Sequence, residues 1–91
     1  MTFKDNPKTM VLTTKRIING EALVLLVFHD AEDGMWQFLD GVDTDENSAA
    51  VISISEIVSI DPNLEKIADL PLGLVAWRND SASEWNVKDN R

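Results

Sequence analysis

The stretch from Ala22 to Asp40 constrains the fold more than any other part of the chain. Residues 22–28 are apolar without a break, and a second, mostly apolar run over 35–39 follows an acidic turn that ends at Gly34. Two such runs joined by a short turn predict a β-hairpin. Because a strand without a polar face is normally an inner strand of its sheet, we expect the rest of the chain to cover this hairpin.

The segment before the hairpin is rich in β-branched residues. Residues 9–19 end at Asn19-Gly20, a dipeptide typical of tight turns. We therefore expect a first strand here, paired through this turn with the strand that begins at Ala22. A short helix over Thr13–Asn19, ended by Gly20, is the alternative. Residues 1–8 show no periodicity and predict an N-terminal arm that can be disordered.

Three short elements are expected after the hairpin. The densely acidic segment 40–48 predicts a loop, and the apolar, β-branched run 49–54 predicts a strand. Ser53 and Glu56 have the spacing of a capping box, which predicts a helix directly after this strand. The side chains expected to face inward from that helix are Ile57, Val58 and Ile60.

A second short helix and a last strand are expected further along. Asp61 is a suitable N-cap and Pro62 fits the first helical turn. The apolar stripe that follows consists of Leu64, Ile67, Ala68 and Leu70. The run 74–78 predicts a strand, and 80–91 a polar tail. Residues 1–91 thus predict one α+β domain, a largely antiparallel sheet of about five strands with two short helices on one face.

Composition and charge exclude several classes of protein. Sixteen acidic and eight basic residues give a formal net charge of -8, and every Asp, Glu, Lys or Arg between Arg16 and Lys66 is acidic. Nucleic acid is a poor partner for such a chain. The absence of cysteine excludes disulfides and thiolate zinc sites. No apolar run approaches the roughly 18 residues that span a bilayer, so we expect a cytoplasmic protein with no membrane partner.

No cofactor or metal is expected. Asp43, Asp45 and Asn47 match the first alternate positions of a calcium-binding loop, but Ser48 stands where that loop needs glycine and Ile54 where it needs glutamate. The glycines are too scattered to form a loop that cradles phosphate. The acidic segment is therefore expected to be a solvated loop.

A Ser-His-Asp triad would have to use His29, the single histidine. A catalytic triad would need His29 with Asp30 or Asp33 and a serine from 53–59 or 81–83, and no G-x-S-x-G pattern accompanies it. We expect a structural histidine that bonds to the turn carboxylates, and nominate no catalytic residue. A small hydrolase or ligand-binding module that uses His29 with nearby carboxylates remains the alternative function.

The three tryptophans receive different predictions. Trp36 and Trp77 lie in expected strands among apolar neighbours and are expected in the core. Trp85 stands alone in a polar segment. It either clamps the tail onto the domain or presents a hot spot to a partner.

The charge distribution favours a basic protein partner. An acidic face would steer such a partner and raise its association rate. The expected partner-binding residues are Asp30, Glu32, Asp33, Asp40, Asp43, Asp45, Glu46 and Trp85. Acidity that serves solubility alone is the competing interpretation. A homo-oligomer formed through an edge strand, Val11–Ile18 or Leu74–Arg78, is a third.

Four short motifs resemble a known family. They are Thr13-Thr14-Lys15-Arg16-Ile17, the run 34–41, Asp61-Pro62-Asn63-Leu64 and the run 70–78, and together they span about residues 11–85. This pattern is similar to the immunity protein thirty-three-like domains, small and mostly bacterial domains of unknown function catalogued near polymorphic toxin genes. The resemblance implies a binding protein, either an antidote that occludes the active site of a toxin or a relative with another partner.

Overall fold

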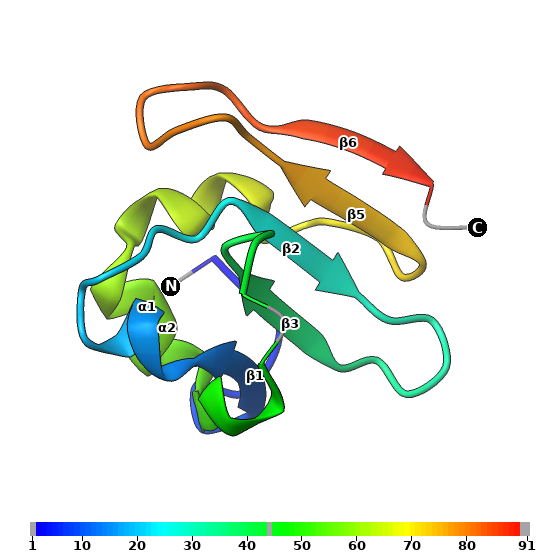
Figure 1. The fold of residues 1–91 in the computed structure, drawn as a ribbon. Helices are drawn as coiled ribbons and strands as arrows, with labels where there is room; N and C mark the ends of the chain where they lie inside the picture. Colours follow the sequence, from blue (N-terminus) through cyan, green and yellow to red (C-terminus); the bar gives the residue numbers. More distant parts are fainter. Residues whose placement is uncertain (1, 44, 90–91) are drawn as a thin grey trace.

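The chain forms a six-stranded sheet in the order β4-β1-β3-β2-β5-β6 (Figure 1). The structure is a computed structural model and describes residues 2–43 and 45–89. The strands are β1 (Met10–Thr14), β2 (Leu26–His29), β3 (Trp36–Leu39), β4 (Ala49–Ser53), β5 (Leu74–Trp77) and β6 (Asn86–Asp89). Only β1 and β3 are parallel, and the other neighbours are antiparallel. The expected α+β class is confirmed, with one strand more than the five expected.

The central hairpin is confirmed. Strand β2 pairs with β3 from Leu26 opposite Leu39 to His29 opposite Trp36, and Gly34 at the end of the turn has a φ of 73°, which favours glycine. Strand β2 is an inner strand, as expected, because β5 lies on its other side. It begins later than Ala22 because the side chain of Val24 turns into the core.

The expected long strand over 9–19 is wrong. Strand β1 ends at Thr14, whose side-chain oxygen accepts a hydrogen bond from Ile17 N–H and caps the short helix α1 (Lys15–Ile18). Because α1 intervenes, β1 does not pair with β2. It lies between β4 and β3, so the helix weighed as the alternative is closer to the structure. Both strands suggested as edges, β1 and β5, are inner strands, and the edges are β4 and β6.

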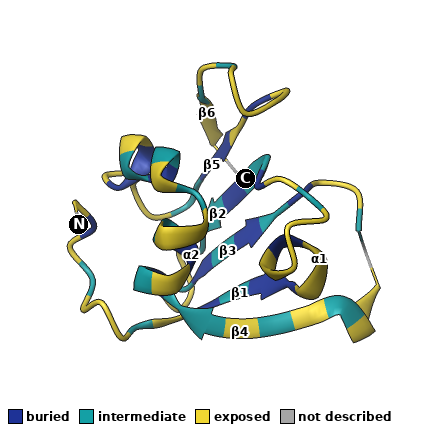
Figure 2. Ribbon diagram, turned by 90° about the vertical axis from the view of Figure 1, so that its left-hand side faces the viewer, coloured by how far each residue is buried: buried dark blue, intermediate teal, exposed yellow. Residues whose placement is uncertain are grey.

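The capping box is confirmed and begins helix α2 (Ile54–Ile60). Asp61 then caps η2 (Pro62–Ile67), a 3₁₀-helix where the sequence suggested an α-helix. Both lie on one face of the sheet (Figure 2), and Ile17 of α1 belongs to the same core cluster as Ile54 and Ile57 of α2. Buried residues that they contribute to the core include Ile54, Ile57, Leu64 and Ile67. Ile60, expected inward, is 43% exposed because it ends α2, where the chain turns toward η2.

Both chain ends contribute more than the sequence indicated. Phe3 is buried, and its ring contacts that of Trp36 edge-on at 5.1 Å between centroids. The tail contains β6, which pairs with β5 from Asn86 opposite Trp77 to Asp89 opposite Leu74. Within residues 2–43 and 45–89, no helix is both long and apolar enough to cross a membrane.

Candidate protein-binding surface

The sheet has one covered and one open face. In a strand, successive side chains point to opposite faces, and residues paired across strands share a face. Val27 and Phe38 therefore lie with Val11 on the face that α2 and η2 cover. The opposite face, here called the open face, follows from the same registers. Its centre consists of Met10, Leu12, Leu26, Phe28, Gln37, Leu39, Val51, Val75 and Trp77, and Thr14, Ala49, Ser53, Asn86 and Lys88 lie at its margin.

The open face is apolar and incompletely covered. Gln37 is the single polar residue at its centre, and the other polar strand residues on this face lie at strand ends or on the edge strand β6. Met10 is 51% exposed, Val51 52% and Trp77 36%. Antiparallel sheets with one solvated face normally carry polar side chains there. The prediction of Trp77 as a core residue is wrong because Ala76 takes the inward position of β5 and directs its neighbour to the open face.

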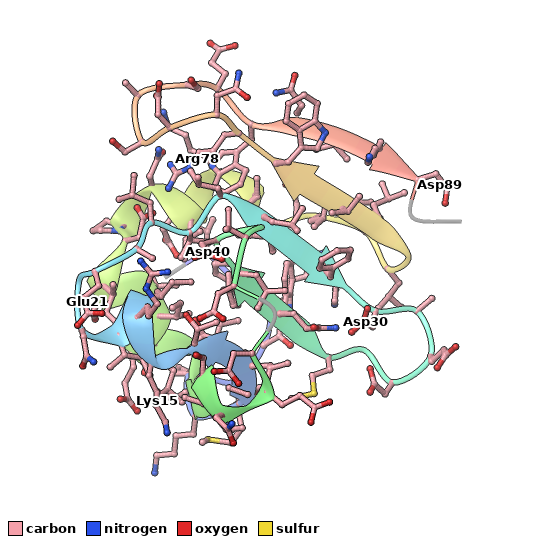
Figure 3. All side chains as sticks on the ribbon, viewed as in Figure 1. Lys15, Glu21, Asp30, Asp40, Arg78 and Asp89 are labelled. Atoms are coloured by element: carbon pink, nitrogen blue, oxygen red, sulfur yellow. The ribbon has the colours of Figure 1, made fainter. Side chains whose placement is uncertain are left out.

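Seven of the expected partner-binding residues form two acidic groups instead of one acidic face. The turn group, Asp30, Glu32 and Asp33, lies beyond the His29–Trp36 end of the hairpin ladder. The loop group, Asp40, Asp43, Asp45 and Glu46, lies beyond the Leu26–Leu39 end. Figure 3 shows Asp30 and Asp40 at these opposite ends of β2 and β3. A four-pair ladder separates the groups by roughly 10 Å or more at about 3.3 Å per residue.

Asp40 has a structural position. It is 8% exposed, and its carboxylate accepts hydrogen bonds from the backbone N–H groups of Val42 and Asp43. Burial alone raises the pKa of Asp40, but these bonds and the charge of Arg16 outweigh it and hold the pKa below its ordinary value. Asp40 therefore shapes the turn after β3 and is poorly placed to touch a partner.

The other acidic residues differ in whether their carboxylates accept hydrogen bonds from the surrounding chain. Asp43 and Asp45 accept backbone N–H bonds within the acidic segment, and Asp33 accepts one within the turn. Asp30 accepts a hydrogen bond of 2.6 Å from Gln37 on the open face. Glu32 and Glu46 are exposed, and their carboxylates make no hydrogen bond or ion pair with the described part of the chain. These two are the acidic groups best placed to meet a basic partner.

The described residues contain no group of histidine and acidic side chains arranged to hold a metal ion. The acidic segment forms a 3₁₀ turn, η1 (Glu46–Ser48), whose N-cap is Asp45. The carboxylates of Asp43 and Asp45 each accept a hydrogen bond from a backbone N–H two residues further along the segment. They do not converge on one point.

Trp85 lies apart from both acidic groups. Its ring packs against the core and carries the guanidinium of Arg78 at 4.4 Å from its centroid. Arg78 has no exposed side-chain area and pairs with Asp61, while its Nε donates to Val24 O. These contacts fit the tail-clamp alternative for Trp85, and we leave it out of the proposed binding surface. Sequence alone could not show that Arg78 and Asp61 meet, because 16 residues separate them in the chain.

His29 is held by different partners from those expected. Its Nδ1 lies 2.7 Å from Leu70 O, and its ring stacks on Trp36 at 3.8 Å. The expected bonds to the turn carboxylates are absent from the described residues. A pocket of about 360 Å³ adjoins it, lined by Lys4, Asp5, His29, Trp36, Ala68, Asp69, Leu70, Pro71 and Leu72. No hydroxyl group lines this pocket, so it contains no serine or threonine nucleophile.

Comparison with protein-family models, with curated proteins and with solved structures found no match to this chain.

Proposed function

We propose that this chain is a non-enzymatic binding domain whose open face takes a protein with an apolar centre and basic residues around it. The single observation that carries the proposal is the second apolar face of the sheet, which the helices of this small domain leave uncovered. Large exposed apolar patches rimmed by polar residues mark interaction sites. The resemblance to immunity protein thirty-three-like domains supports the same class of function, and a basic toxin is one partner of this chemistry.

The apolar centre and the acidic groups have different roles in the proposed complex. Full burial of a large apolar side chain contributes about 1.5–3 kcal/mol, so the half-exposed Met10, Val51 and Trp77 together can supply roughly 3 kcal/mol. Exposed acidic residues contribute less to affinity. They accelerate association with a basic partner, and salt weakens this effect.

A pair of charge reversals tests where a basic partner binds. The variant Glu32→Lys with Glu46→Lys changes one free carboxylate in each acidic group. The control Glu84→Lys with Asp69→Lys changes two exposed acidic residues outside those groups, with the same change in net charge. We expect capture of a basic protein from the source-cell lysate at low salt by wild type and control. The first variant should lose most of that capture.

Equal capture by both variants would contradict a role for the acidic groups. Equal loss in both would show that only the net charge of the protein matters. Capture that survives a high-salt wash identifies the part of the affinity that comes from apolar contact.

Binding of a small ligand at His29 is the second candidate, favoured by the rigid imidazole beside the pocket. His29→Ala removes that ring and should abolish any thermal stabilisation by a ligand that binds there. Leu72→Ala, on the pocket rim, is a milder control. In a protein that acts through the open face, His29→Ala leaves partner affinity within about twofold once the variant is shown to be folded.

A further inference from the structure

The two edges of the sheet differ in how they are protected. Edge strands expose unpaired backbone groups, and proteins usually guard them with charged side chains. Strand β6 has Lys88 and Asp89 in its four residues. Strand β4, Ala49–Ser53, has no charged residue. Figure 2 shows β4 at the foot of the sheet with no element beyond it.

The register shows which backbone groups of β4 point outward. Ile54 N–H donates to Thr9 O at 2.8 Å, which places a hydrogen-bonded pair there. Such pairs alternate along an antiparallel ladder. Ile52 and Ala50 therefore bond toward β1, and the N–H and C=O of Val51 point away from the sheet. No hydrogen bond from these two groups to the described residues is present.

The structure closes the edge on both sides of Val51. The N–H of Ala49 bonds to Glu46 O at the end of η1. The N–H of Ser53 faces Glu56 Oε1 at 3.4 Å as part of the capping box. The backbone groups still available on this edge are therefore the N–H and C=O of Val51 and the C=O of Ala49. Val51 is also 52% exposed on the open face, so the edge and the open face are continuous.

We propose that β4 takes an extended segment of the protein partner as an added strand, centred on Val51 and with Lys or Arg beyond both ends. This inference rests on the proposed function and names its binding mode. A β-strand added to a sheet edge gains backbone hydrogen bonds, while alternate side chains give specificity. The partner residue opposite Val51 can exchange two backbone hydrogen bonds with it. Apolar side chains of the added strand that lie on the same side as Val51 extend the open face.

Charge disfavours a second copy of this chain as the occupant. If two β4 strands paired antiparallel with Val51 opposite Val51, the segment near Glu46 of one copy would approach Glu56 of the other. This would occur at both ends of the pair. Like charges placed opposite each other are destabilising, whereas a strand with basic flanks meets Glu46 and Glu56 favourably.

The test uses the capped peptide KKTVTVTKK as a probe for the ¹⁵N-labelled full chain. We expect amide shifts at Val51 and its neighbours, and exchange of the Val51 amide hydrogen slowed at least tenfold at saturation. In a second version of the peptide, consecutive central residues carry N-methyl groups. Their amides can then donate no hydrogen bond from either edge of the peptide strand, so this version should not bind. The peptide EETVTVTEE should bind at least tenfold more weakly.

Val51→Lys places a positive charge on this edge, which disfavours the addition of a strand. It should raise the dissociation constant of the peptide at least tenfold. Val87→Lys is the matched control, because Val87 is also 52% exposed and lies on the other edge. It should change the constant by less than threefold. Val51→Pro removes the outward N–H, and proline is tolerated at such edge positions. It should abolish binding, and Val51→Lys keeps the test valid if the proline variant does not fold.

Shifts centred on β6, or no shift at millimolar peptide, would overturn the edge-strand proposal. Shifts confined to Phe28 and Trp77 would also overturn it while leaving binding through the open face intact. The two proposals therefore fail on different observations.

Discussion

Asp40 shows how a carboxylate in an acidic protein can act mainly on its own backbone. Its oxygen Oδ1 accepts two backbone N–H bonds, at 3.0 Å from Val42 and 2.9 Å from Asp43. The sequence grouped it with the surface acids because composition does not distinguish a turn-forming aspartate from a free one. The N–H bonds favour the charged form of Asp40, and this couples the turn to pH.

Asp40→Asn tests that coupling. Asparagine keeps an oxygen acceptor but loses the charge, so we expect the free energy of unfolding at pH 7 to fall by about 1 kcal/mol. The pKa of Asp40 is lowered on folding from 3.8. Its stabilising contribution is therefore full above that value and is lost as pH falls through the folded pKa. Urea unfolding should show the difference at pH 7 and its progressive loss as the pH falls below 3.8.

The exposed Glu32→Gln variant serves as the control and should match wild type at both pH values. A difference for Asp40→Asn that stays constant from pH 7 to pH 2 would contradict the assignment of the pH dependence to this carboxylate.

At the level of single elements, the capping box joins the edge strand to the helix that covers the core. The hydroxyl of Ser53 accepts the N–H of Glu56 at 3.2 Å. Ser53→Ala should lower the free energy of unfolding by about 1 kcal/mol. Ser59→Ala, in the last turn of the same helix, should cost less than about 0.5 kcal/mol. Equal losses, measured by urea unfolding, would show that the cap does not hold α2.

Local signals in the sequence predicted the elements well. The hairpin, the strand before α2, the capping box and the last strand before the tail all have short-range patterns. The error at 9–19 has a local cause too. Thr14 is β-branched and suits a strand, yet its hydroxyl also caps α1. The chain therefore leaves the strand at Thr14 and begins a helix. The parallel pairing of β1 with β3 joins distant segments and leaves no such local signal.

The proposed binding surface follows from the sequence only in part. The acidic residues could be nominated because charge is visible in the sequence, but the burial of Asp40 could not be predicted. Their division into two groups follows from the length of the hairpin strands. The open face could not be predicted, because an apolar strand residue has the same pattern whether a helix covers it or not. Leu26 and Phe28 look like core residues until the helices are placed.

The whole molecule has too few helices for its sheet. α2 and η2 lie over one face, and α1, drawn beside α2 in Figure 1, adds Ile17 to the same core. A chain of 91 residues has few residues outside its sheet with which to cover both faces. The molecule therefore combines a high negative charge with an uncovered apolar face, and the proposed function explains both properties with one partner.

The most direct test of binding through the open face uses the double variant Met10→Gln with Trp77→Gln. The quantity measured is the dissociation constant of its complex with the captured basic partner. The matched control is Leu23→Gln with Leu72→Gln, which changes two leucines outside the open face that are 49% and 54% exposed. Neither pair alters the net charge. We predict that the first variant binds at least tenfold more weakly at high salt while the control stays within twofold. Equal affinities would contradict binding through the open face.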